Sequence, residues 1–161
     1  MTINFILNGE DVAIRTEADG RLLDILRRSF NLLGAKSGCL SGRCGVCFVI
    51  LNSAVVPSCL VPAFRVRNSE IITIEGFAQT DEYQDIVTGF SQAGVECCGY
   101  CDSGKILAAG ALLERIPRPS REEALAAFAG IRCRCTEPES LAEGVLAAAD
   151  IRQRRFYGRG T

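Results

Sequence analysis

The chain has 161 residues, of which 48% are hydrophobic and 23% are charged, and its formal net charge is −1. This is enough apolar sequence for a buried core in one or two small domains. The near-neutral charge argues against nucleic acid as a partner, because nucleic-acid-binding surfaces are clearly basic. No run of about 18 apolar residues is present, so no membrane span is expected. Residues 1–9 lack the basic start and twin arginine of an export signal, which favours a cytoplasmic location.

Two counts restrict the chemistry further, because the sequence has no histidine and nine cysteines. The lack of histidine excludes Ser-His and Cys-His catalytic pairs within this chain. It also excludes Rieske centres, haem with an axial histidine, and Cys₂His₂ zinc sites. Without an export signal, a disulfide framework is not expected. We therefore expect reduced cysteines that bind metal.

The first half of the sequence carries strand signals around one cysteine-rich loop. Alternating apolar residues on both sides of Asn8-Gly9 predict a hairpin. Leu22, Ile25, Leu26 and Phe30 recur at helical spacing. The predicted elements are, in chain order, a hairpin at 3–14, a helix at 21–30, a Cys- and Gly-rich loop at 34–47, and strands at 48–51, 55–56 and 71–74.

Helical signals replace strand signals after residues 75–80. Ala- and Leu-rich segments with helical spacing predict four helices, at 81–93, 105–115, 121–129 and 139–149. Ser120 and Glu123 form a predicted capping box for the third of them. The sequence therefore predicts an α+β fold, with a β-rich domain at 1–77 and a four-helix domain at 78–161.

Four cysteines of the first half have the spacing C-x4-C-x2-C-x11-C; they are Cys39, Cys44, Cys47 and Cys59. Their first three members match the plant-type [2Fe–2S] spacing. Four thiolates around a small cluster require tight backbone turns, which Gly38, Gly42 and Gly45 permit. A zinc site or unrelated buried thiols are the alternatives, although zinc sites favour paired Cys-x₂₋₄-Cys knuckles.

Four cysteines of the second half have the spacing C-x2-C-x31-C-x-C; they are Cys98, Cys101, Cys133 and Cys135. This spacing alone also fits zinc. Each pair precedes a predicted helix, however, and the partial positive charge of a helix N-terminus suits a negatively charged four-thiolate cluster. A second [2Fe–2S] cluster is therefore the preferred interpretation.

The motifs around these cysteines resemble the two-cluster iron–sulfur subunit of the molybdenum hydroxylases, a family that includes xanthine dehydrogenase, aldehyde oxidoreductase, carbon monoxide dehydrogenase and nicotinate dehydrogenase. The resemblance covers about residues 3–149. It is carried by the segment Lys36 to Cys47, by Ser58-Cys59, by Cys98-Gly99-Tyr100-Cys101, and by Cys133-Arg134-Cys135-Thr136. It implies a β-grasp plant-type ferredoxin domain followed by a four-helix bundle, with one [2Fe–2S] cluster in each.

The resemblance also implies a role in a hetero-oligomer. The chain would carry electrons between a molybdopterin-binding large subunit, which hydroxylates an aldehyde or an N-heterocycle, and an FAD-binding medium subunit. The cluster of the helical domain would face the molybdopterin, and the ferredoxin-type cluster would face the flavin. The chain would not act on a substrate by itself.

Several residues around the second set depart from the family's usual motifs. Cys97 stands where the family usually has glutamine, and Asp102-Ser103 stand where it has Thr-Pro. Ile131, Glu137 and Pro138 replace the usual Asn, Gly and Tyr. One alternative is therefore the same relay docked on a catalytic subunit without molybdopterin, such as a flavin dehydrogenase. A further alternative is a non-redox, zinc-stabilised interaction module.

Other residues have open roles. Cys97 and Arg134 are expected near a cofactor, but Cys97 is also interpretable as a plain buried thiol or as a ligand that exchanges with Cys98. The C-terminal arginines are Arg152, Arg154, Arg155 and Arg159. They form either a solvated tail or a strap that docks on a partner subunit.

Overall fold

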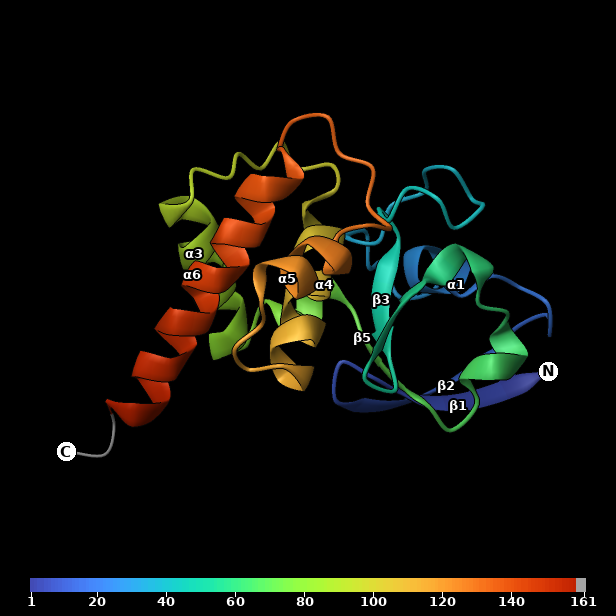
Figure 1. Cartoon of the computed structure of the whole chain (residues 1–161). Helices are drawn as coiled ribbons and strands as arrows, with labels where there is room; N and C mark the ends of the chain where they lie inside the picture. The colour runs from blue at the N-terminus through green and yellow to red at the C-terminus, as the bar shows by residue number, and fades with distance from the viewer. Residues whose placement is uncertain (159–161) are drawn as a thin grey trace.

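The computed structural model describes residues 1–158 and places a mixed sheet beside a group of helices (Figure 1). The strands are β1 (Thr2–Leu7), β2 (Glu10–Arg15), β3 (Phe48–Leu51), β4 (Ala54–Pro57) and β5 (Glu70–Ile72). The helices are α1 (Leu22–Arg28), α2 (Ile74–Phe77), α3 (Asp81–Gln92), α4 (Asp102–Arg115), α5 (Arg121–Ala127) and α6 (Pro138–Tyr157). Two 3₁₀ turns, η1 (Ser58–Leu60) and η2 (Ala63–Val66), connect β4 to β5.

The sheet has the strand order β2-β1-β5-β3-β4. Strands β1 and β2 form the predicted hairpin, with Ile3 opposite Ile14 and Leu7 opposite Glu10. The central strands β1 and β5 are parallel, whereas the other pairings are antiparallel. Helix α1 packs its Leu22 and Leu26 into the same core as the inward residues of β1. This arrangement confirms the predicted α+β fold.

The helical half has its own core, to which α3, α4, α5 and α6 all contribute. Helices α3 and α6 cross closely at Gly89. The crossing is so close that a side chain on Gly89 would come within 2.5 Å of the Gly144 carbonyl oxygen. The capping box is present, with the Glu123 amide donating to Ser120 Oγ at 3.2 Å and the Ser120 amide donating to Glu123 Oε2 at 2.7 Å. Within residues 1–158, no helix is both long and apolar enough to cross a membrane.

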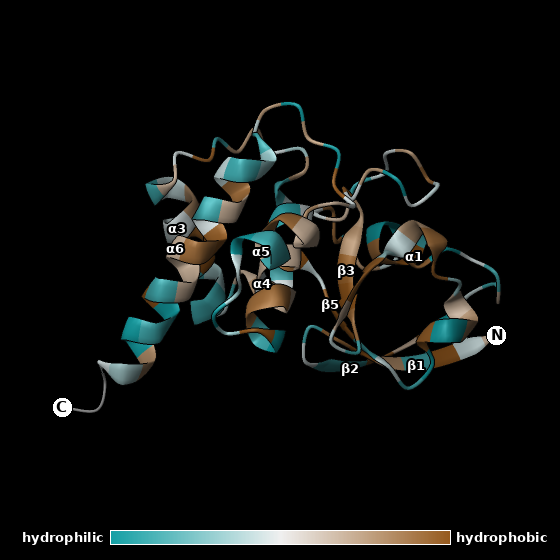
Figure 2. Ribbon diagram, in the orientation of Figure 1, coloured by the Kyte–Doolittle hydropathy of each residue, from teal (hydrophilic) through white to brown (hydrophobic). Residues whose placement is uncertain are grey.

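Strand β3 joins the two cores. Successive strand residues point to opposite faces of a sheet, and Val49 belongs to the sheet-side core while Ile50 belongs to the helical one. Strands β3 and β5 are accordingly among the most apolar parts of the ribbon (Figure 2). The two halves are therefore packed through a shared central strand.

Several element boundaries differ from the sequence-based prediction, and three of these differences bear on the packing. The strand predicted at 71–74 ends at Ile72, and Ile74–Phe77 form the short helix α2, whose Phe77 ring packs against Gly110 of α4. Helix α4 begins at Asp102 rather than at residue 105. Helix α6 continues to Tyr157, well beyond the predicted end at residue 149.

The extension of α6 explains the C-terminal arginines. Arg155 Nε and Nη2 donate to Asp85 Oδ2 on α3 at 3.0 and 2.8 Å, and its guanidinium also pairs with Asp81 and Glu82. Arg152 donates to the Leu113 carbonyl at the end of α4. The solvated-tail interpretation is therefore wrong for these two arginines, which bind their own chain. Arg154 is exposed, and Arg159 lies outside the described residues.

Replacement of Arg155 by Met should lower the free energy of unfolding by about 3 kcal/mol, because Asp85 would keep a nearly buried carboxylate without its main partner. Urea denaturation followed by circular dichroism measures this change. Arg154→Met is the matched control, since it removes the same charge from an exposed site and should change stability by less than about 0.5 kcal/mol. Equal effects of the two variants would contradict the expected role of Arg155.

Candidate metal centres

The eight cysteines of the two sets lie on four segments, of which the cysteine loop and the segments before α4 and α6 run along the upper edge in Figure 1 and η1 lies below them, beside α1. The loop 34–47 carries three cysteines of the first set, and η1 carries Cys59. The segments before α4 and α6 carry the two pairs of the second set. All nine cysteines are free thiols. The chain thus brings each predicted set of four into one region.

Within the first set, the thiols meet in two pairs. Cys44 interacts through its side chain with Cys39, and Cys47 does so with Cys59. Turn η1 is held against Cys47 because Ser58 donates to the Cys47 carbonyl oxygen from both its hydroxyl, at 2.7 Å, and its amide, at 3.1 Å. Cys47 and Cys59 are buried, whereas Cys39 is exposed. The first set therefore has an inner and an outer pair.

Backbone amides point at the sulfurs of the outer pair. The amides of Ser41 and Arg43 donate to Cys39 Sγ at 3.4 and 3.2 Å, and the Cys39 amide donates to Cys44 Sγ at 3.5 Å. This requires left-handed backbone at Gly42 and Gly45, with φ of +73° and +76°. Hydrogen bonds from Ser41 and Arg43 lower the pKa of Cys39 to about 6. Burial, in contrast, raises the pKa of Cys47 to about 11.

The second set also forms two pairs. Cys101 interacts with Cys133, and Cys98 interacts with Cys135. The Cys135 amide donates to Cys133 Sγ at 3.3 Å. Burial alone would raise the pKa of Cys133, but the amides of Cys135 and Thr136 and the neighbouring side chains lower it to about 7. Burial raises the pKa of Cys101, the residue that precedes α4, to about 11.

A buried lysine adjoins this second set. The side chain of Lys105 is 0% exposed, and its Nζ lies 3.5 Å from Asp102 Oδ1 and 3.3 Å from Thr136 Oγ1. Burial alone would lower the pKa of Lys105, but Cys133, Cys101 and Asp102 outweigh burial and raise it. Sequence reasoning missed Lys105; the available signal was a lysine directly before the apolar run of α4, which begins at Ile106.

These donor sets fit a [2Fe–2S] cluster. Four thiolates arranged as two pairs match two irons with two sulfur ligands each, and backbone donors to the sulfurs stabilise the negative charge. A side chain on Gly38 would come within 2.9 Å of Cys44 Sγ, so the loop keeps the space beside this sulfur clear. In the part of the chain that the structure describes, no group of three or more Cys, His, Asp or Glu residues is arranged to hold a single metal ion.

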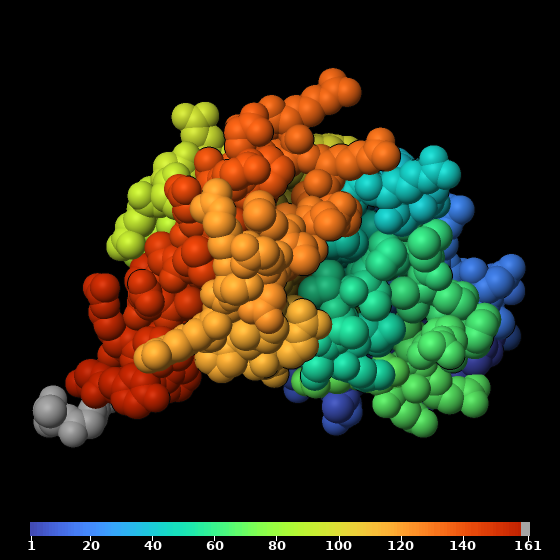
Figure 3. Space-filling model, viewed as in Figure 1, coloured from blue at the N-terminus to red at the C-terminus, as the bar shows by residue number. Residues whose placement is uncertain are grey.

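The two cysteine regions touch each other. The Arg132 amide donates to the Cys44 carbonyl oxygen at 3.1 Å, which links a residue of the first set to the neighbour of Cys133. Gly45 lies so close to Gly130 that a side chain on Gly45 would come within 2.9 Å of the Gly130 carbonyl oxygen. The same contact is visible in Figure 3, where the orange segment that precedes α6 lies against the cyan cysteine loop.

Four of the residues that depart from the family's usual motifs have local structural roles. The Asp102 carboxylate accepts from the Gly99 amide, and the Ser103 hydroxyl donates to the Gly34 carbonyl oxygen at 2.9 Å. Pro138 occupies the first turn of α6, a position where proline is favoured. Ile131 packs against Gly45, where a side chain on Gly45 would come within 2.8 Å of Ile131 Cγ1.

Cys97 and Arg134, the two expected neighbours of a cofactor, are both exposed. The buried-thiol interpretation of Cys97 is therefore wrong. Cys97 lines a hollow of about 350 Å³, together with residues of α3 and with Ile106 of α4. Its nearness to a partner's cofactor stays a prediction.

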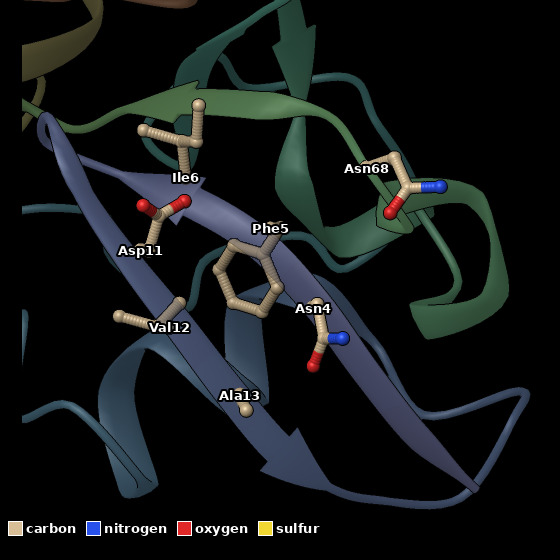
Figure 4. A pocket seen from close by; sticks show the side chains of 7 residues that line it. All are labelled: Asn4, Phe5, Ile6, Asp11, Val12, Ala13 and Asn68. Carbon is tan, nitrogen blue, oxygen red and sulfur yellow. The ribbon is translucent and has the colours of Figure 1, made fainter.

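A second hollow, of about 500 Å³, lies far from this chemistry. It sits on the β1–β2 hairpin and is lined by Asn4, Phe5, Ile6, Asp11, Val12, Ala13 and Asn68 (Figure 4). It contains no cysteine, and Asp11 is its only ionisable side chain. This hollow therefore offers neither ligands for a metal nor an acid–base pair.

Comparison with known proteins places both halves of the chain. A model of a 2Fe-2S iron-sulfur cluster binding domain matches residues 5–70, and a model of a [2Fe-2S] binding domain matches residues 73–146. The nicotinate dehydrogenase small FeS subunit of Eubacterium barkeri is 46% identical over 136 residues, which is 84% of this chain and 87% of that protein.

Solved structures show the same layout. Quinoline 2-oxidoreductase from Pseudomonas putida 86 superposes with a TM-score of 0.86 and 31% identity over 96% of both chains. The aldehyde oxidoreductase from Desulfovibrio desulfuricans gives a TM-score of 0.85 and 34% identity over 94% of this chain but only 17% of that one. The counterpart of this chain is thus a small subunit in some relatives and one part of a longer polypeptide in others.

The fold and the two domain matches define a protein that carries two [2Fe–2S] clusters. The chain belongs to the molybdenum hydroxylase family, as one of its iron–sulfur subunits. It is an electron-transfer subunit of a multi-subunit oxidoreductase and is not catalytic by itself.

Replacement of Gly104 by Ala should destabilise the contact between the two cysteine regions, because the added methyl group would overlap the Gly45 carbonyl oxygen, a backbone atom that cannot move aside. We expect the free energy of unfolding to fall by about 1–3 kcal/mol, although alanine is the better helix former. Gly130→Ala is the matched control, since the nearest atom to its new methyl group is Phe48 Cζ at 3.3 Å, on a side chain that can shift. Urea denaturation of both variants measures the difference. A Gly104→Ala protein as stable as the parent would refute the close contact.

Proposed function

We propose that the eight paired cysteines are the cluster ligands. Cys39 with Cys44 and Cys47 with Cys59 would hold the first cluster; Cys101 with Cys133 and Cys98 with Cys135 would hold the second. The support is the pairing itself, because the side chain of each of these thiols interacts with that of its proposed partner. The domains would run over 1–77 and 78–161, with α2 at their junction.

When bound, each [2Fe–2S] cluster accepts and releases one electron at a time. The observation that carries the relay is the hydrogen bond from the Arg132 amide to the Cys44 carbonyl oxygen. It connects the two ligand sets through one hydrogen bond and the peptide bond between Arg132 and Cys133. Gly45 and Gly104 keep this connection short, because a side chain on Gly45 would meet the Gly130 carbonyl oxygen and one on Gly104 would meet the Gly45 carbonyl oxygen.

The partners are a molybdopterin-binding large subunit, next to the second set, and an FAD-binding medium subunit, next to the first. The exposed Cys98 and Cys135 present the second set at the surface, and the exposed Cys39 does the same for the first.

The similarity to nicotinate dehydrogenase and quinoline 2-oxidoreductase favours an N-heterocycle as the substrate of the large subunit. Nine free thiols support a cytoplasmic location.

The altered residues around the second set favour one competing partner, a catalytic subunit without molybdopterin. Cys97 and Asp102 lie beside the exposed Cys98, where a partner's cofactor would approach. The matches of both halves to [2Fe–2S] domain models speak against the zinc-stabilised interaction module.

The native complex, captured through this chain without oxygen, should contain iron, molybdenum and flavin together. Elemental analysis and flavin fluorescence measure these contents in one preparation. Iron with molybdenum and flavin would support the proposed partners. Iron without molybdenum would instead establish the competing partner, and zinc in place of iron would refute the cluster assignment.

Single Cys→Ser replacements should separate the two clusters. Cys47→Ser and Cys133→Ser should each lower the iron content by about half, because each removes a ligand of one cluster only. The EPR spectrum of the reduced protein should lose a different signal in each variant. Cys97→Ser is the control and should keep both signals. Loss of iron in Cys97→Ser would show that Cys97, and not Cys98, is the ligand.

A further inference from the structure

Lys105 is the most unusual buried residue of the chain. It is 0% exposed and lies in the first turns of α4, where Asp102 is the other charged residue and the rest are small or apolar. Lysine is almost never fully buried without a partner, because an isolated ammonium in the protein interior loses its hydration. The structure has to compensate this charge within a few ångströms of Nζ.

Asp102 compensates the charge only in part. Its Oδ1 is buried and accepts no hydrogen bond, and it faces Lys105 Nζ at 3.5 Å, which is an ion-pair distance longer than a good hydrogen bond. The other carboxylate oxygen, Oδ2, accepts from the Gly99 amide. Thr136 Oγ1, at 3.3 Å, contributes a neutral acceptor and itself donates to the Glu96 carbonyl oxygen at 2.8 Å. The remaining groups beside Lys105 are the side chains of Cys133 and Cys101, and the Cys101 carbonyl oxygen accepts from the Lys105 amide at 3.2 Å.

The two cysteine sets are therefore stabilised in different ways. Backbone amides, which are neutral dipoles, point at Cys39 Sγ and Cys44 Sγ in the first set. In the second set the amides of Cys135 and Thr136 act on Cys133, and in addition a buried ammonium lies beside Cys101 and Cys133. A full charge in a water-poor site acts more strongly than a dipole at a similar distance.

We propose that Lys105 is a positioning residue for electron transfer, which raises the reduction potential of the second cluster by placing a buried positive charge beside its ligands Cys101 and Cys133. One-electron reduction makes the cluster with its four thiolates more negative by one unit, and no bond is made or broken. A neighbouring ammonium stabilises the reduced form more than the oxidised one. Asp102 partly screens this charge and thereby opposes its effect.

The inference rests on the proposed ligand assignment, and the two are tested by different readouts. Iron content and the presence of two EPR signals test the assignment. The reduction potentials of the two signals, measured by EPR-monitored titration of the purified complex, test the role of Lys105. The first cluster serves as an internal reference, because Lys105 adjoins only the second set.

Lys105→Met keeps the length of the side chain and removes its charge. We expect the equilibrium constant for reduction of the second cluster to fall about tenfold, which is ~59 mV for a one-electron couple, while the first cluster stays unchanged. Lys105→Arg keeps the charge and should stay close to the parent potential. Arg118→Met is the charge-matched control, because it removes one positive charge from an exposed site after α4, and it should shift neither cluster.

Asp102→Asn should shift the potential of the second cluster in the direction opposite to Lys105→Met. The amide keeps an oxygen for the Gly99 amide but removes the carboxylate charge, so the potential of the second cluster should rise. Opposite shifts in Lys105→Met and Asp102→Asn would not arise from a merely structural role. An unchanged potential in Lys105→Met, or equal shifts of both clusters, would overturn the proposal. If the Lys105→Met protein fails to incorporate the second cluster, the Asp102→Asn protein decides. A higher potential of its second cluster supports the proposal, and an unchanged or lower potential overturns it.

Discussion

The close approach of three glycines is the constraint on which the rest of the structure depends. Gly45 of the first cysteine loop meets Gly104 at the start of α4 and Gly130 before α6, and neither Gly45 nor Gly104 has room for a side chain in this contact. This contact allows the Arg132 amide to reach the Cys44 carbonyl oxygen. Without it, the two halves would still share strand β3, but the ligand sets would lack this short connection.

The same contact gives a physical account of several departures from the family's motifs. Ser103 ties the start of α4 to Gly34, and Ile131 packs against Gly45, so both residues hold the two halves together. Pro138 and Asp102 begin helices or turns. These substitutions serve the fold of this chain itself. A change of residue beside a cofactor site is therefore weak evidence, taken alone, for a change of cofactor in the partner.

Charge is distributed unequally between the two centres. The first relies on amide dipoles that a glycine-rich loop directs at its sulfurs, and the second relies in addition on the buried pair of Lys105 and Asp102. Since electrons move toward the higher potential, the proposed effect of Lys105 would favour electron transfer to the second cluster. The position of one lysine thus connects helix packing to the function of the subunit.

The sequence by itself determined the features that depend on residues close together in the chain. The hairpin, the cysteine spacings and the capping box of Ser120 and Glu123 all follow from local patterns, and the structure has the hairpin and the capping box where they were predicted. The pairing of all eight ligands remains a proposal.

Only the tertiary structure decided that α6 runs to Tyr157, that residues 74–77 form a helix, and that Lys105 is buried. Each of these depends on contacts between residues far apart in sequence, such as Arg155 with Asp85, Phe77 with Gly110, and Lys105 with Thr136. Periodicity and spacing carry no information about such contacts, because they arise only when the two halves of the chain pack together.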